Sequence, residues 1–220
     1  MNKCPKITAI VPAYNEEKTI GNVLKTLKRT ELIDEIIVIN DGSVDNTYEV
    51  AESYGVKIIN FKHNQGKSRA VKKVCSKINT DIIFFCDADL VGLKSSFVEQ
   101  IISPVIDEEA VMSIGLRDKG IRVQNYLQYR FPKISGERAI LYETFKEILN
   151  SSFFSYEWGM ETAMNEYCRR YRLRVKAKVL HYNHTHMPRK MGMMKGIKGI
   201  LKQASELCYI LFQIRFLKKT

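Results

Sequence analysis

The sequence predicts an α/β protein with a mostly parallel central sheet and helices on both faces. The strands expected in the first half are continuous apolar runs, which is typical of strands that are buried on both faces of a sheet. Segments of roughly ten to fifteen residues with apolar residues at helical spacing separate these runs. Polar turn residues follow most of the strand runs, so the loops that they form are expected along one edge of the sheet.

The first half begins with a strand over residues 7–11, an unbroken apolar run that Pro12 ends. Residues 17–29 place their apolar side chains on one face of a helix. A second apolar run, residues 35–39, is the next strand, and the turn-forming sequence at residues 40–43 ends it. These residues therefore predict one strand–helix–strand unit.

The same alternation continues to the middle of the chain. Residues 45–54 are expected to form the second helix, with Asp45 at its N-cap, and residues 56–61 the third strand. A polar loop at residues 63–66 precedes a third helix, which extends to about residue 78. Residues 81–86 then form the fourth strand.

The second half is less regular. We expect a helix that ends with residues 99–106 and a strand at residues 110–115. Two further helices are predicted at residues 137–149 and 159–169, and a strand at residues 173–180.

The composition fits one catalytic domain with a short appendage. The chain has 220 residues and a formal net charge of +11. We predict a catalytic domain over residues 1–190 and a basic, amphipathic C-terminal helix in residues 191–220. An N-terminus without an apolar leader and the lack of a long apolar run favour a cytoplasmic protein with no membrane span. The five cysteines show no metal-binding spacing and are expected to be reduced thiols.

The basic segment predicts an anionic partner. Lys195, Lys198 and Lys202 lie on one helical face, and apolar residues lie on another. Such a helix can bind the inner face of a membrane peripherally. The alternative is a helix that packs its apolar face on the catalytic domain and leaves its lysines in water.

An acidic pair, Asp87 and Asp89, directly follows the fourth strand and is separated only by Ala88. Two carboxylates at the end of a strand can bind a hard divalent cation, which often shares its oxygen ligands with a diphosphate. The alternative is an ordinary Asp-rich turn.

Four motifs in order closely resemble those of the family 2 glycosyltransferases, which have the GT-A (nucleotide-diphospho-sugar transferase) fold. The resemblance covers about the first 90 residues strongly and the rest weakly. Each motif alone also fits an ordinary turn or helix start, whereas the four together are specific. The motifs are VPAYNEE at 11–17, VINDGSVDNT at 38–47, NQGK at 64–67 and DAD at 87–89.

The resemblance implies a binding site for a nucleotide-sugar donor, with a UDP-sugar favoured. Asp41 would accept a hydrogen bond from the base, and Gly66 and Lys67 would bind phosphate at a helix start. Asp87 and Asp89, with Ala88 between them, would contact the donor and hold Mn²⁺ or Mg²⁺. The metal would stabilise the departing nucleoside diphosphate. The residues implied for the nucleoside are Pro12, Ala13, Tyr14 and Glu16.

The second half contains SGERA at 135–139 and WGME at 158–161. These segments resemble those of glucosyl-3-phosphoglycerate synthases and lipid-acceptor members of the family, and this implies an acceptor site. Gly136 and Glu137 would contact the substrate, and Arg138 would act on the acceptor. Glu161 best matches the general base of inverting members. The alternative for Arg138 and Glu161 is a place in the first turn of a helix, and the stereochemical outcome stays open.

Three histidines follow the last predicted strand. His184 matches the third metal ligand of several family members, with His186 as the second choice. A zinc site made by His181, His184 and His186 is the rival, although strand alternation would send His181 and His184 to opposite faces.

Other classes of protein fit less well. A sugar-nucleotide-forming nucleotidyltransferase or a dehydrogenase would need a Gly-rich turn after the first strand, where this chain has residues 11–14. A basic protein that binds nucleic acid would explain the net charge but not the acidic pair, so we expect no nucleic-acid partner. The acceptor can be lipid-linked, a polysaccharide or a small molecule.

Overall fold

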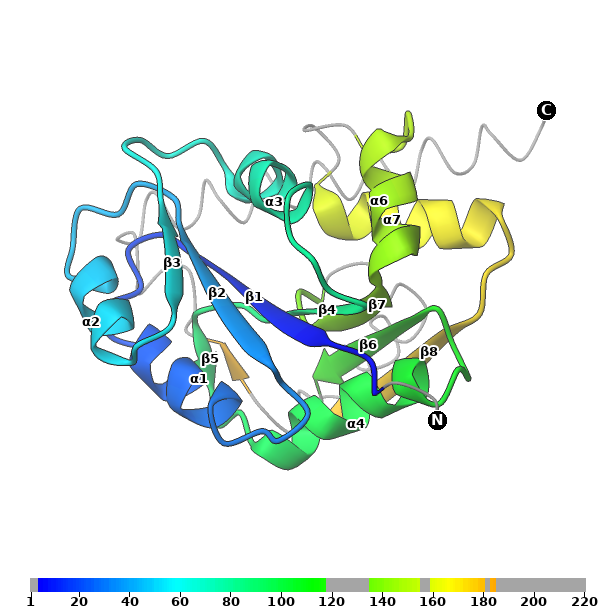
Figure 1. Cartoon of the computed structure of the whole chain (residues 1–220), viewed down its shortest axis with the longest axis horizontal. Coiled ribbons are helices and arrows are strands. Elements are labelled where there is room, and N and C mark those ends of the chain that lie inside the picture. The colour runs from blue at the N-terminus through cyan, green and yellow to red at the C-terminus, as the bar shows by residue number, and fades with distance from the viewer. Residues whose placement is uncertain (1–3, 118–134, 155–158, 181–182, 185–220) are drawn as a thin grey trace. The chain divides into compact units, whose positions relative to one another are not determined.

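The computed structural model describes residues 4–117, 135–154, 159–180 and 183–184 (Figure 1). The described residues form a seven-stranded sheet with the strand order β3-β2-β1-β4-β7-β6-β8. The chain divides into compact units at residues 1–183 and 184–220. The predicted domain boundary at residue 190 lies outside the described residues and stays a prediction.

The predicted strands and helices of the first half are confirmed, but the predicted N-cap is not. The second helix begins at Thr47 with Asn46, not Asp45, as its N-cap, and Oδ1 of Asp45 accepts a hydrogen bond from the Thr47 amide at 3.1 Å. Strands β1, β2, β3 and β4 pair in parallel, and the helices lie between them in sequence. Helix α1 begins three residues later than predicted, because the amides of Thr19 and Ile20 bond the Glu16 carbonyl in a preceding turn. The elements are β1 (Ile7–Ala13), α1 (Ile20–Leu27), β2 (Glu35–Asn40), α2 (Thr47–Ser53), β3 (Lys57–Asn60), α3 (Lys67–Cys75) and β4 (Ile82–Phe85).

The second half contains one antiparallel strand that the sequence did not predict. The helix expected from residue 137 begins only at Tyr142, because residues 138–141 form strand β7 between β4 and β6. A short apolar run does not distinguish a buried strand from a buried helix. The elements are β5 (Leu90–Val91), α4 (Ser95–Ile106), β6 (Met112–Arg117), β7 (Arg138–Leu141), α6 (Tyr142–Asn150), α7 (Met160–Arg170), β8 (Val175–Leu180) and β9 (Asn183–His184), with β5 and β9 paired in a second sheet.

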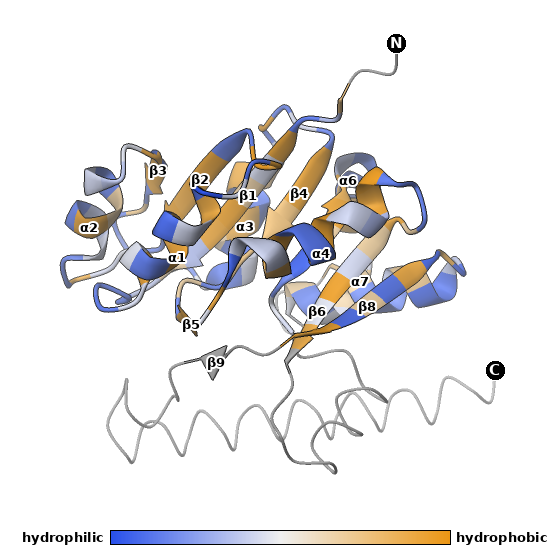
Figure 2. Ribbon diagram, turned by 90° about the horizontal axis from the view of Figure 1, so that it is seen from below, coloured by the Kyte–Doolittle hydropathy of each residue, from blue (hydrophilic) through white to orange (hydrophobic). Residues whose placement is uncertain are grey.

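The core has two layers, one on each face of the sheet. Helices α1, α2 and α4 cover one face, and α3, α6 and α7 cover the other. Consecutive residues of β1 alternate between the layers, since Ala9 and Val11 lie in one cluster and Ile10 in the other. This explains the unbroken apolar strands, which are orange in Figure 2.

The remaining predictions concern the cysteines, membrane spans and the C-terminal segment. Cys75, Cys86 and Cys168 are free and buried, whereas Cys4 is free and exposed. Within the described ranges, every helix is too short or too polar to cross a bilayer. The amphipathic helix predicted in residues 191–220, with His181 and His186, lies outside the described residues.

Candidate active site

The parallel strands bring the predicted donor-site residues to one edge of the sheet. In the register of the sheet, Ala13 at the end of β1 pairs with Asn40 at the end of β2. Asp41 and Asp87 follow the carboxyl ends of β2 and β4. The predicted clustering of these loops is therefore confirmed by the topology, while the role of each residue is a separate question.

Hydrogen bonds join the loop after β1 to the loop after β2. The Asn15 amide donates to Oγ of Ser43 at 3.0 Å, and the Val44 amide donates to Oδ1 of Asn15 at 2.9 Å. The Glu16 amide donates to Oγ1 of Thr47 at 2.7 Å. The two loops therefore form one wall. No local sequence pattern predicts the bonds of Ser43 and Thr47, because they depend on tertiary contact.

The residues predicted to contact the nucleoside differ in exposure. Tyr14 is 44% exposed. Ala13 is buried and Pro12 is half-buried, and both lie at the end of strand β1. The Glu16 carboxylate accepts a hydrogen bond from the hydroxyl of Thr19 at 3.0 Å. Tyr14 is thus the side chain of this group that is most accessible to a ligand.

Asp41 holds the loop that precedes α3. Its two carboxylate oxygens accept hydrogen bonds from the amides of Gln65 at 2.9 Å and Gly66 at 2.8 Å. Gly42 has a φ of +72°, and a Cβ there would lie 2.5 Å from the carbonyl carbon of His63, so the close approach of this loop requires glycine. Asp41 is 4% exposed and both of its oxygens already accept loop amides, so its contact with a base stays a prediction.

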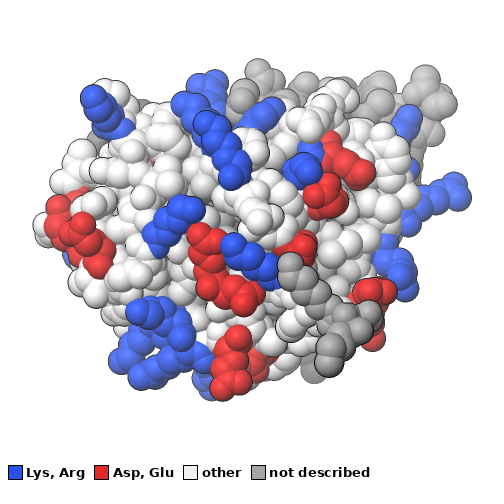
Figure 3. Space-filling model, in the orientation of Figure 1, with Lys and Arg blue, Asp and Glu red and all other residues white. Residues whose placement is uncertain are grey.

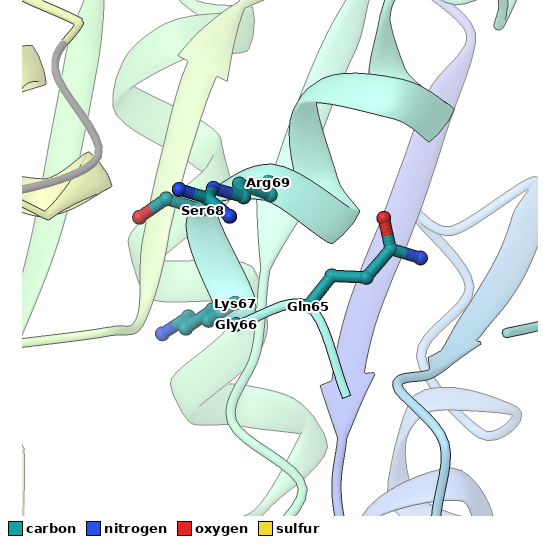
Figure 4. Close-up of a pocket in the computed structure, with 5 residues that line it drawn as sticks. All are labelled: Gln65, Gly66, Lys67, Ser68 and Arg69. Carbon is teal, nitrogen blue, oxygen red and sulfur yellow. The ribbon is translucent and has the colours of Figure 1, made fainter. Parts of the chain in front are cut away.

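The N-terminus of α3 opens into a cavity of about 290 Å³ (Figure 4). Lys67, Ser68 and Arg69 line it together with Gln65 and Gly66. The first turn of α3 contains no acidic residue, and Lys and Arg side chains gather over this helix in Figure 3. Backbone amides, a helix dipole and cationic side chains in one place are well suited to bind phosphate.

Lys67 connects the two halves of the site. Its Nζ atom lies 2.7 Å from Oδ1 of Asp87 and 2.6 Å from Oε1 of Glu161. Burial alone lowers the pKa of Lys67, but the charges of the two carboxylates outweigh burial and raise it. For Glu161, burial raises the pKa, and the charges of Lys67 and Arg138 outweigh it and lower the pKa to about 2.

The acidic pair is suited to a hard cation. Asp87 and Asp89 are half-buried, whereas Ala88 between them is 3% exposed. Gly136 packs against the Asp87 carboxylate so closely that a Cβ on Gly136 would lie 2.6 Å from Cγ of Asp87. The lack of a side chain at Gly136 therefore leaves the space that this carboxylate occupies.

Gly136 belongs to a turn whose polar side chains are buried. Ser135, Glu137 and Arg138 are each at most 1% exposed. The Ser135 hydroxyl bonds the Glu137 carboxylate at 2.9 Å, and Nε of Arg138 donates to the Ser135 carbonyl at 2.8 Å. This burial favours a supporting role for Glu137 and Arg138 over the direct substrate contacts that the resemblance implied.

A divalent cation would find carboxylate oxygens here, the ligands that Mn²⁺ and Mg²⁺ prefer. Among the described residues, no group of three or more His, Cys, Asp or Glu side chains is arranged to hold a metal ion. The Asp87 and Asp89 carboxylates therefore fit a cation that completes its coordination with substrate oxygens. His184 lies in strand β9, and its role as a metal ligand stays a prediction.

A family model and a curated relative match the chain. Residues 8–159 match the model of the glycosyl transferase family 2. The chain is 37% identical over 102 residues to 4,4'-diaponeurosporenoate glycosyltransferase of Staphylococcus aureus strain USA300. This match covers 44% of the chain and 27% of the relative, so the chain spans about a quarter of the length of the curated relatives that it matches.

Solved structures share the fold. Glucosyl-3-phosphoglycerate synthase from Mycobacterium tuberculosis with Mn²⁺, UDP and glucosyl-3-phosphoglycerate matches with a TM-score of 0.70 and 22% identity, over 92% of this chain and 80% of that chain. The same enzyme with Mg²⁺ and UDP matches with a TM-score of 0.70 and 23% identity, over 92% and 79% of the two chains. The α/β fold of those enzymes is therefore the fold of this chain.

Proposed function

The chain belongs to glycosyl transferase family 2, as its motifs predicted, and on that premise we propose that it transfers a sugar from a UDP-sugar to an acceptor hydroxyl with the help of Mn²⁺ or Mg²⁺. One observation supports this proposal most strongly. Lys67, at the start of the phosphate-binding helix, contacts both Asp87 of the acidic pair and Glu161 on the opposite side of the site. Two ion pairs of Lys67 thus connect candidate groups for the donor, the metal and the acceptor.

The donor would lie along the edge of the sheet. The wall formed by the loops after β1 and β2 would bind the nucleoside through Tyr14, Glu16 and the C-terminal end of β1. The diphosphate would then lie at the N-terminus of α3, where Gly66 and Lys67 provide amides and positive charge. The solved structures of similar fold contain UDP together with Mn²⁺ or Mg²⁺, which supports the same donor class here.

Asp87 and Asp89 would hold the divalent cation, with His184 proposed as a further ligand. When bound, the cation would act as a Lewis acid that withdraws charge from the departing nucleoside diphosphate. Gly136 leaves space for the Asp87 carboxylate, and the ion pair with Lys67 holds that carboxylate. The chain's own contribution is therefore to place two carboxylates and one ammonium group around the leaving group.

Glu161 is the proposed acceptor-side carboxylate. With a pKa of about 2, it is ionised at neutral pH and can accept a hydrogen bond from an acceptor hydroxyl. A carboxylate of such low pKa is a weak general base. If the Lys67 ammonium left Glu161 and bound a donor phosphate, the main charge that lowers the pKa of Glu161 would be removed. Glu161 would then be a stronger base.

Thermal denaturation with nucleotides tests the donor site. UDP with Mn²⁺ is expected to raise the melting temperature, because a ligand that binds only the folded state stabilises it by mass action. GDP, Mg²⁺ and EDTA are the comparison conditions, and UDP release from UDP-glucose is the accompanying activity assay. The shift with UDP and Mn²⁺ is expected to disappear in Asp89→Asn and to persist in Asp107→Asn, an Asp at the end of α4. Absence of a shift with every nucleotide and metal would contradict the proposal.

A further inference from the structure

Arg138 is the largest of the fully buried side chains in the described part of the chain. It lies in the middle of the sheet, where β7 pairs with Phe85 of β4 on one side and with Ile114 of β6 on the other. A guanidinium group is costly to bury unless its donors are bonded. Its partners therefore indicate what the side chain does.

The bonds of Arg138 reach both sides of the candidate active site. Nε donates to the Ser135 carbonyl at 2.8 Å, and Ser135 is followed by Gly136, which packs against Asp87. Nη1 donates to Oδ1 of Asn165 at 2.8 Å and to the carbonyl of Glu161 at 3.3 Å.

The second set of bonds fixes the beginning of a helix. Glu161 and Asn165 are one turn apart at the start of α7, so Nη1 bonds both the first and the second turn of the helix. The amide of Met160 also donates to Oγ of Ser68 at 3.2 Å, which ties the same turn to α3. The orientation of the Glu161 side chain toward Lys67 depends on this turn.

We propose that Arg138 is a positioning residue that fixes the Glu161 carboxylate relative to the Asp87 carboxylate by joining the turn at Ser135 to the first turn of α7. The expected effect on catalysis rests on the proposed function. The expected effect on the position of α7 rests on the hydrogen bonds alone. Arg138 acts through Glu161 and Asp87 and makes no contact with the acceptor. The planar, forked guanidinium suits this task because it bonds in several directions at once, which a lysine ammonium on a flexible stem does less well.

The test uses Arg138→Lys, which keeps the charge, and Asn165→Ala, which removes the side-chain oxygen that accepts from Nη1. Arg169→Lys is the matched control, because Arg169 lies on the same helix and is exposed in an ion pair with Glu166. Two measurements are made on each full-length variant. Hydrogen exchange reports the amides of residues 163–166, among them Ala163, which bonds the Gly159 carbonyl. UDP release from UDP-glucose with Mn²⁺ gives kcat and KM.

We expect Arg138→Lys to lose exchange protection in residues 163–166 and to keep it in β1 and β2. We expect kcat to fall by about a hundredfold, because small misplacements of reacting groups have effects of this size, while KM for UDP-glucose changes less than about threefold. Asn165→Ala should change the same quantities in the same direction by less. Arg169→Lys should match the wild type.

Other results would overturn the inference. Unchanged exchange in α7 would show that Arg138 does not hold the helix. Loss of protection throughout β1 and β2 as well would show a general role in stability. If Arg138→Lys fails to fold, Asn165→Ala decides between these outcomes by the same exchange measurement. If the wild type releases no UDP, the proposed function is in doubt, whereas the exchange measurement still decides whether Arg138 positions α7.

Discussion

The ammonium of Lys67 lies 2.6 Å from the carboxylate of Glu161, although 94 positions separate the two residues in the sequence. The same ammonium lies 2.7 Å from Asp87, so one positive charge compensates two carboxylates of the candidate active site. A divalent cation at Asp87 and Asp89 would compete with Lys67 for the Asp87 oxygen. This competition gives a direct expectation about metal affinity.

Lys67→Met is expected to strengthen Mn²⁺ binding and to weaken UDP binding. Without the ammonium, Asp87 is fully available to the metal, whereas the diphosphate loses a charged hydrogen bond that contributes about 1.5–3 kcal/mol, or about ten- to a hundredfold in affinity. Calorimetric titration with Mn²⁺ alone and then with UDP measures both effects. Lys62→Met, in an exposed residue before α3, is the control and should change neither affinity. Weaker Mn²⁺ binding in Lys67→Met would contradict the competition.

Gly136→Ala is expected to weaken Mn²⁺ binding by about ten- to a hundredfold, as changes next to metal ligands commonly do. The new Cβ would displace the Asp87 carboxylate. Gly21→Ala is the matched control, because its Cβ would meet the far end of Tyr54, at 3.1 Å from the hydroxyl oxygen, and Cγ1 of Val50 at an ordinary contact distance of 3.5 Å. Both variants are titrated with Mn²⁺ in the absence of nucleotide. Equal affinities in the two variants would show that metal binding does not need the space that Gly136 leaves for Asp87.

The sequence predicted that the loops of the donor half lie together, and the reason is physical. Asp41 and Asp87 follow parallel strands and Lys67 begins the helix between β3 and β4, so the topology alone brings them to one edge. The link from Lys67 to Glu161 depends on how α7 packs against α3, which local periodicity does not encode. Strand β7 was missed for a related reason, because its position between β4 and β6 is a long-range property of a short apolar run.

The basic C-terminal segment is expected to bind anionic membranes. Lys195→Glu, Lys198→Glu and Lys202→Glu together reverse the basic face that the sequence predicts. Each basic residue near an anionic surface contributes about 1 kcal/mol, so the triple variant should lose most of the association with vesicles that contain phosphatidylserine. Vesicle flotation measures it, and neutral vesicles provide the control. Equal flotation of both proteins would favour a helix packed on the catalytic domain.

Asp41→Asn is expected to disturb the loop that leads into α3. The two oxygens of Asp41 accept hydrogen bonds from the amides of Gln65 and Gly66. An asparagine offers only one oxygen, so one partly buried amide would face an NH₂ group. An unsatisfied buried donor costs about 1–3 kcal/mol, and this is the expected loss in the free energy of unfolding by urea. Asp107→Asn, at the exposed end of α4, should lose less than about 0.5 kcal/mol. A stability equal to that of the wild type would show that the loop holds without the carboxylate.

The ion pair of Glu161 makes stability depend on pH in a defined direction. The pKa of Glu161 in the folded protein, about 2, lies below the ordinary value of 4.5, so the carboxylate stabilises the folded state above pH 4.5 and loses this contribution as the pH falls toward 2. Glu161→Gln should therefore lower the free energy of unfolding by about 1–3 kcal/mol at pH 7, and the difference from the wild type should shrink between pH 5 and pH 3. Urea unfolding in EDTA measures this difference without metal. Glu143→Gln, which changes an exposed side chain of α6, should stay within about 0.5 kcal/mol of the wild type at each pH. A difference for Glu161→Gln that is constant from pH 7 to pH 3 would show that the charge of Glu161 does not contribute to stability.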